Sequence, residues 1–379
     1  MSRPILSALA LATGLFGAPA NAALITLDIT PASTLRAAVA RANLDINPLN
    51  TYDLRLAPGT YLNDFAPTIV RPMIIEGTAG AAQTTLKATQ TLPNSKGILL
   101  TISSLLVRGL TFTGAAISNA LGGNGAGIRD QIGTGGSDPA GTLIVKDSVF
   151  RNNQEGILTG GSGGREHVVV SGTKFLDNGN ANQSYFQHGL YVNSAATVEV
   201  ANSLFCGQLI GHNLKVRSRA TKITGVSSYE GALGPGCTRA GTASRGIDIP
   251  NGGALEMEDV YLFQGSLSQN SAMFAYGEEG VTAAINGATL SDVDFVSSSG
   301  GTGIQWYGGT NPCILTNVTF SGLARNQSPT GCTVSDPASA TLLAAGTGPT
   351  KIPEPGTLAL LGGALLALVF LGLRPGREG

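Results

Sequence analysis

A short pattern recurs along the middle of the chain and constrains its fold more than any other feature. In each copy an aliphatic residue precedes a polar one, then Gly, Asp or Asn, and then a segment ending in Phe. Since Gly, Asp and Asn tolerate left-handed backbone, each copy predicts two short strands joined by a tight bend. Six copies share this pattern: VRGLTF (107–112), VKDSVF (145–150), VSGTKF (170–175), VANSLF (200–205), LSDVDF (290–295) and LTNVTF (315–320).

Two looser copies, ITGVSSY (223–229) and MEDVYLF (257–263), would place Tyr229 and Phe263 in the same inward row. A second strand follows each aromatic residue at a variable distance, as in EGILT, HGLYV, HNLKV and RGIDI. Stacked short strands with one variable loop per repeat predict an all-β fold, a right-handed single-stranded parallel β-helix. A β-propeller would need four strands per blade, which is more than these repeats supply.

The segment STLRAAVARAN (33–43) has the apolar spacing of an amphipathic helix, with Ser33 or Thr34 as its N-cap. A solenoid needs such a capping helix, because its first coil would otherwise expose an apolar end. We therefore assign residues 23–323 to the β-helix domain. The Gly-, Ser- and Pro-containing residues 324–351 are predicted to form a flexible spacer.

Both ends of the chain have the character of targeting segments. Residues 1–22 have the basic start, short apolar run and Ala-x-Ala ending of a signal peptide. Residues 352–379 place Pro353-Glu354-Pro355 before an apolar run, a predicted transmembrane helix, that is followed by arginines. This order resembles the PEP-CTERM sorting signal. The resemblance implies export in a Gram-negative bacterium to the cell envelope, cell surface or medium, a link to exopolysaccharide, and removal by an exosortase-type enzyme. A plain C-terminal anchor is the alternative.

Four cysteines in an exported chain favour two disulfides, and three pairings are possible. We favour the two local ones, Cys206–Cys237 and Cys313–Cys332. No C-x-x-C spacing occurs, so a metal site on cysteine is not expected. A formal net charge of -1 argues against binding of nucleic acid through bulk electrostatics. We expect a monomer that needs no cofactor and no metal.

Equivalent positions of successive coils lie about 4.8 Å apart in a β-helix, so aligned residues become neighbours. Aligning the second strands on their inward apolar residues turns the next residue of each strand outward. The resulting outward column includes Tyr191, Lys215 and Asp248. Neighbouring columns contain Glu155, His188, His212 and Arg245 on one side, and Asn193 and Arg217 on the other.

The segments HGLYV, GHNLKVRSRA, GTASRGIDIPNGG and AMFAYGEEG occur in this order. They resemble a set of exported bacterial β-helix proteins related to the pectate lyase superfamily, and the opening coils also resemble pectin-lyase-like proteins. The match adds Asn251 and Glu279 to the predicted site. The chain departs from that set at Gly189 and Gly246 and near Arg217, which leaves open whether Arg217 or Arg219 joins the site.

The superfamily acts mostly on acidic polysaccharides. β-Elimination of a uronate needs a cation for its carboxylate, a base for the C5 proton and an acid for the leaving oxygen. The predicted catalytic residues are His188 or His212 as base, Tyr191 as acid, Lys215 as cation and Asp248 as orienting group. The predicted substrate-binding residues are Asn193, Arg217, Arg219, Arg245, Asn251 and Glu279.

Other functions remain open at this point. C5 epimerisation would use the same groups without cleavage of the glycosidic bond. Glycoside hydrolysis would need a second carboxylate beside Asp248, for which Glu278 or Glu279 is the candidate. A non-catalytic matrix or surface protein could bind acidic polysaccharide through the same residues. Lys215 beside Asp248 would also make an ordinary cross-strand ion pair.

Overall fold

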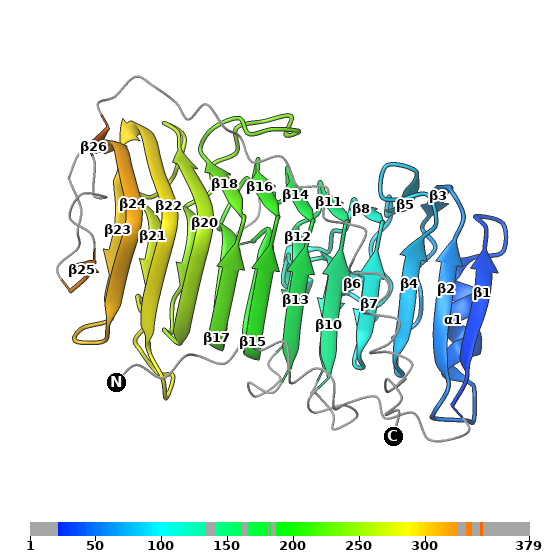
Figure 1. Cartoon of the computed structure of the whole chain (residues 1–379). Helices are drawn as coiled ribbons and strands as arrows, with labels where there is room; N and C mark the ends of the chain where they lie inside the picture. Colours follow the sequence, from blue (N-terminus) through cyan, green and yellow to red (C-terminus); the bar gives the residue numbers. More distant parts are fainter. Residues whose placement is uncertain are drawn as a thin grey trace, which may run out of the picture.

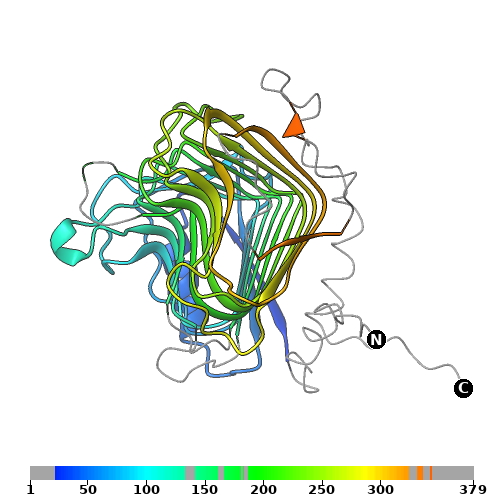
Figure 2. The same ribbon diagram turned by 90° about the vertical axis from the view of Figure 1, so that its left-hand side faces the viewer.

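The computed structural model describes residues 22–132, 141–160, 166–180, 182, 187–323, 331–335 and 342–343. The strands of this part of the chain pair in parallel, coil upon coil, from β1 at one end to β24 at the other (Figure 1). Seen along the stack, the coils superpose on a common cross-section, from which loops and the short 3-10 helix η3 (Asn119–Leu121) project (Figure 2). The predicted parallel β-helix is confirmed.

The described strands form three parallel ladders, one on each side of the cross-section. The first ladder contains β1 (Leu24–Ile29), β2 (Thr51–Leu56), β4 (Met73–Gly77), β7 (Leu105–Arg108), β10 (Thr142–Lys146), β13 (His167–Ser171) and parts of β15 (Leu190–Ala201), β17 (His212–Thr224), β20 (Ala254–Gln264), β22 (Gly287–Gly300) and β24 (Cys313–Leu323).

The second ladder contains β3 (Gly59–Leu62), β5 (Thr84–Lys87), β8 (Thr111–Thr113), β11 (Val149–Arg151), β14 (Lys174–Leu176), β16 (Leu204–Cys206), β18 (Ser227–Glu230) and the later parts of β20, β22 and β24. The third contains β6 (Gly97–Thr101), β9 (Ala126–Asp130), β12 (Glu155–Thr159), the first parts of β15 and β17, β19 (Arg245–Ile249), β21 (Ala272–Tyr276) and β23 (Thr302–Trp306).

The tight bend expected in each repeat forms between the first and second ladders. Its third residue has a left-handed φ, from 47° at Asp147 and Asn202 to 64° at Gly109. Asp259, Asp292 and Asn317 adopt the same conformation, as the Asx residue type allows. The sequence pattern therefore marks each of these corners correctly.

The aromatic residue after the bend points into the solenoid. The rings of Phe112, Phe150, Phe175 and Phe205 stack in one row, with centroids 4.6–5.2 Å apart, and each side chain is at most 2% exposed. Phe295 and Phe320 stack in the same way further along. This row follows from the parallel register, which places Phe upon Phe.

The two looser repeats behave differently, so the expected inward positions of Tyr229 and Phe263 were wrong. Ser228 and Leu262 are in register with Phe205 and continue the inward row. The looser copies have one additional residue before the aromatic, and a shift of one residue turns a side chain to the opposite face. Tyr229 and Phe263 instead pack in a small outer cluster with Leu176, Cys206 and Tyr261.

The capping helix α1 (Leu35–Asn43) begins after Thr34, whose side chain accepts a hydrogen bond from the Ala37 N–H. Its apolar face, Leu35, Val39 and Ala42, is buried at the first coils. The predicted cap is confirmed, with Thr34 as the N-cap residue.

At the other end, β25 (Thr333–Val334) and β26 (Leu342–Leu343) pair with β24, within the region expected to be a spacer. Both predicted disulfides, Cys206–Cys237 and Cys313–Cys332, are present, which is compatible with an extracellular protein. The predicted signal peptide, apart from Ala22, and the predicted sorting signal at 352–379 lie outside the described residues. Among the described residues, no helix is long and apolar enough to cross a membrane.

We expect Phe175→Ala to lower the stability of the solenoid strongly, by about 3–5 kcal/mol, because it opens a cavity within the stacked row. Phe263→Ala is the matched control and should cost less than half as much, because Phe263 is only partly buried against the outer cluster. Urea unfolding followed by circular dichroism measures both. Equal losses in the two variants would contradict the assignment of the inward row.

Candidate functional site

The third ladder carries the predicted site. Tyr191, Lys215 and Asp248 lie in register on β15, β17 and β19, and the column continues through Ala275 on β21 to Gln305 on β23. The residues that precede the first three, Leu190, Leu214 and Ile247, are fully buried. The predicted alternation of inward and outward side chains is thus confirmed for these strands.

Lys215 and Arg217 jointly hold one carboxylate. Lys215 Nζ lies 2.9 Å from Glu279 Oε1, and Arg217 Nη2 lies 2.6 Å from Glu279 Oε2. Glu279 comes from the loop after β21, and its backbone N–H donates to the Pro250 carbonyl. Lys215 Nζ is also 3.2 Å from Asp248 Oδ2. We call Lys215 and Arg217 the carboxylate-binding pair.

Amide and aromatic groups fix the Arg217 side chain. Its Nε donates to Asn251 Oδ1 at 2.8 Å and its Nη1 to Asn193 Oδ1 at 3.2 Å. Its guanidinium lies over the Tyr191 ring, 5.2 Å from the centroid, and the Tyr191 hydroxyl also donates to Asn193. A register shift in β15 after Val192 places Asn193 at this corner. Arg217 is therefore oriented before any ligand arrives.

The two histidines stack on adjacent coils, with ring centroids 5.1 Å apart. His188 Nδ1 accepts a hydrogen bond from the His212 backbone N–H, 2.9 Å away. A backbone N–H can only donate, so the ring proton of neutral His188 lies on Nε2. Glu155 supports this arrangement, because its Oε2 accepts the His188 backbone N–H at 2.8 Å.

His212 has a partner at each ring nitrogen. Its Nδ1 lies 2.8 Å from Ser244 Oγ, and its Nε2 lies 3.4 Å from Asp248 Oδ2. The carboxylate can only accept, which places the ring proton on Nε2 and leaves Nδ1 to accept the Ser244 hydroxyl. The basic nitrogens of both histidines are thus occupied by donors. This weakens the predicted role of either as the base for a sugar C5 proton.

Burial dominates the protonation of these rings. Burial, together with the charges of Lys215 and Arg217, lowers the pKa of His188 to about 3. Burial also lowers the pKa of His212 well below its ordinary value, with His188, Lys215 and Arg245 acting in the same direction. Both imidazoles are therefore neutral at physiological pH.

The charged residues keep their charges through pairing. Burial disfavours charged Lys215, but Asp248 and Glu279 outweigh it, and its pKa is raised. Burial also opposes charge on Glu279, yet the hydrogen bonds from Arg217 and Lys215 lower its pKa overall. Burial raises the pKa of Asp248, which Lys215 partly offsets, and Asp248 Oδ1 is buried without a hydrogen-bond partner.

Two predicted substrate-binding arginines, Arg245 and Arg219, take no part in the described contacts with Glu279. Arg245 is only 2% exposed, and its Nη2 donates to both oxygens of Glu278, at 2.9 and 2.8 Å. Arg245 therefore holds the Glu278 carboxylate from a buried position. Arg219 is exposed on β17, and the structure gives it no hydrogen bond or ion pair with the cluster. The register question is thus decided for Arg217 and against Arg219.

Positive and negative charges balance in the described cluster. Lys215, Arg217 and Arg245 face the carboxylates of Asp248, Glu278 and Glu279, so the described cluster is balanced. Among the described residues, no group of three or more His, Cys, Asp and Glu side chains is arranged to hold a metal ion.

Sequence reasoning missed Ser244. The residue stands directly before RGIDI, so the register that aligns Arg245 with His212 also brings Ser244 close to the His212 ring. Ser244 precedes the aligned strand cores, so the strand alignment makes no prediction for it. The sequence predicts Glu278 only as a candidate carboxylate for hydrolysis and does not predict its contact with Arg245.

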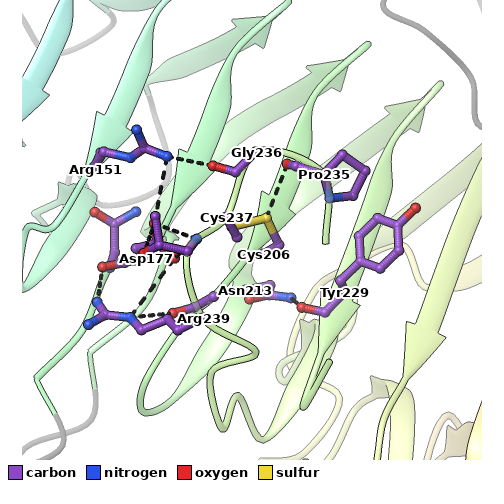
Figure 3. Close-up of a disulfide and its surroundings, with 12 residues drawn as sticks. Arg151, Asp177, Cys206, Asn213, Tyr229, Pro235, Gly236, Cys237 and Arg239 are labelled. Atoms are coloured by element: carbon purple, nitrogen blue, oxygen red, sulfur yellow. Dashed lines mark hydrogen bonds and ion pairs between the residues drawn. A yellow bond between two sulfur atoms is a disulfide. The ribbon is translucent and has the colours of Figure 1, made fainter. Parts of the chain in front are cut away.

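The loop between β18 and β19 is anchored to the solenoid at Cys237 and ends with Ser244, which contacts the His212 ring. The Cys206–Cys237 bridge fastens this loop to β16 (Figure 3). Thr238 donates from its N–H and hydroxyl to the fully buried Asp177. At the end of the loop, the Ser244 N–H donates to the Gly211 carbonyl at 2.6 Å. The loop is therefore anchored by the disulfide at Cys237, and the backbone of Ser244 is held by its hydrogen bond to Gly211.

The sequence matches no protein-family model and no curated protein.

We expect the buried, neutral His188 to make the protein less stable in mild acid. The unfolded chain takes up a proton near pH 6.5, whereas the folded one does so only near pH 3. The contribution of neutral His188 to the free energy of unfolding is complete above pH 6.5 and is lost as the pH falls towards 3. The loss between pH 7 and pH 5 is about 2 kcal/mol.

Urea unfolding at both pH values measures this loss in the wild type and in His188→Asn. The Asn side chain can still accept the His212 N–H but does not titrate, so the variant should lose less stability on acidification. An equal loss in both proteins would show that His188 does not titrate as expected.

Proposed function

We propose that the protein binds an acidic, uronate-containing polysaccharide through Lys215 and Arg217. The observation that carries this proposal is the Glu279 carboxylate, which the pair holds by one oxygen each. A sugar carboxylate has the same two oxygens and charge, and paired charged donors are strong and directional partners for it. Glu279 would occupy the position of the uronate group until the polymer displaces it.

Several features of Glu279 suit it to such an exchange. Its side chain is 42% exposed, whereas those of Lys215 and Arg217 are 11% and 22% exposed. It lies on a loop between Gly277 and Gly280, which both have positive φ. The cations are held by the sheet, and the carboxylate comes from a turn. The turn that carries Glu279 is therefore the element that can move when a ligand carboxylate binds.

Chemistry on the bound uronate is the second candidate, as β-elimination or C5 epimerisation. The specific observation in its favour is Asp248, whose Oδ1 has no hydrogen-bond partner and whose pKa burial raises. Both properties suit a base, and neutralisation of the uronate carboxylate would acidify its C5 proton. Tyr191 is the candidate acid. Glycoside hydrolysis has less support, because Glu278 and Glu279 are both engaged by cations.

Export to the cell envelope, surface or medium of a Gram-negative bacterium would bring the protein to such a polymer. This part of the proposal depends on the sequence of the two ends, which resemble a signal peptide and a sorting signal processed by an exosortase-type enzyme. Polymer binding itself can be tested without it.

We expect Glu279→Gln to bind polygalacturonate or alginate more tightly than the wild type, by roughly five- to tenfold, because an internal competitor for the cations is lost. Arg217→Ala should weaken binding, and added salt should weaken it in all variants. Calorimetry with a neutral glucan as reference measures these effects.

Glu256→Gln is the matched control, since Glu256 pairs with Lys222 on the first ladder, away from the cluster. It should bind like the wild type. Unchanged or weaker binding by Glu279→Gln would contradict the displacement of Glu279 by a uronate.

The chemical candidate has a separate readout. β-Elimination would create an unsaturated product with ultraviolet absorbance, and Asp248→Asn should abolish it while polymer binding persists. New reducing ends without this absorbance would favour hydrolysis. Binding with no product on any of these polymers would leave a non-catalytic matrix or surface protein.

A further inference from the structure

Ser244, His212 and Asp248 form a chain of contacts through one imidazole ring. Ser244 Oγ lies 2.8 Å from His212 Nδ1, and Asp248 Oδ2 lies 3.4 Å from His212 Nε2. Ser244 is partly exposed, the His212 side chain is 14% exposed and Asp248 is 1% exposed. The serine and the imidazole are therefore both partly exposed, and the carboxylate lies deepest, with the imidazole in contact with both of the other groups.

This order is that of a nucleophile, its base and an orienting acid. A serine hydroxyl becomes a useful nucleophile when a neutral imidazole accepts its proton and a carboxylate stabilises the resulting imidazolium. Such groups are recognised by their mutual geometry and not by their positions in a sequence. Here Nδ1 faces the serine and Nε2 faces the carboxylate, and either ring nitrogen can serve as the base.

Placement of Ser244 does not depend on the sheet alone. Its backbone N–H is bonded to Gly211, and its loop is fastened by the Cys206–Cys237 disulfide. The equivalent residue on the next coil is Ser271, because Ile247 is in register with Phe274. Ser271 is exposed and has no histidine partner, so the contact of Ser244 with an imidazole is particular to this coil.

We propose that Ser244 is the nucleophile of an acyl-ester hydrolase whose base is His212 and whose orienting carboxylate is Asp248. The substrate class is a short acyl ester on a sugar hydroxyl. The choice of a sugar ester rests on the proposed binding of polysaccharide, whereas the hydrolysis of an ester does not.

The reaction balances with water as the only co-reactant. Ser244 Oγ bonds to the ester carbonyl carbon while its proton passes to His212 Nδ1. The carbon–oxygen bond to the sugar then breaks, and Nδ1 gives the proton to the departing sugar oxygen. Water attacks the acyl-serine, leaves one proton on Nδ1, and that proton returns to Ser244 Oγ as the acyl group leaves as a carboxylic acid.

A fluorophosphonate probe and 4-nitrophenyl acetate test this assignment on the full chain. We expect the probe to label Ser244, located by mass spectrometry of the digested protein. Ser244→Ala and His212→Ala should each lose labelling and lower the hydrolysis rate by about 10³-fold or more. Ser271→Ala, the matched control on the next coil, should keep both.

Circular dichroism and binding of polygalacturonate show whether Ser244→Ala remains folded. Loss of hydrolysis with binding retained supports the ester-hydrolase assignment. Absence of labelling in the wild type, labelling at another serine, or full hydrolysis by Ser244→Ala would overturn it. Because Glu279→Gln tests polymer binding separately, failure of one proposal is distinguishable from failure of the other.

Discussion

The parallel register of the coils is the constraint on which the rest of the structure depends. Each repeat turns at a residue with left-handed φ, and in four successive repeats the rings of Phe112, Phe150, Phe175 and Phe205 then lie directly upon one another. A one-residue slip would turn every inward side chain outward, so burial of this row fixes the register. The cluster around Lys215 and Arg217 takes its geometry from that register, because its strands belong to the same coils.

Electrostatic balance is the main property of the cluster. Three cations are placed close together in a partly buried position, and each is matched by a carboxylate from a neighbouring strand or turn. Unpaired charges would be costly there, since burial disfavours an ion that lacks a partner. In the proposed mode of binding, a ligand carboxylate would enter by replacing Glu279, which preserves the balance. Addition of a ligand without such an exchange would bring excess negative charge.

The sequence predicted the fold and much of the site because period and register are local properties. The bends, the capping helix, both disulfides and the alignment of Tyr191 with Lys215 and Asp248 follow from residue spacing. The prediction from sequence was wrong for Tyr229 and Phe263, where one additional residue turns the side chain to the opposite face of the strand. It also failed for Ser244 and for the pairing of Arg245, because loops and turns that join different coils supply these contacts, and their paths are not encoded in the repeat.

A crystal structure of Glu279→Gln with a short uronate oligosaccharide tests the central claim most directly. We predict that a sugar carboxylate lies between Lys215 Nζ and the Arg217 guanidinium, within hydrogen-bonding distance of both. An oligosaccharide bound on another face of the solenoid, with this pair of cations left without a sugar carboxylate, would contradict the account.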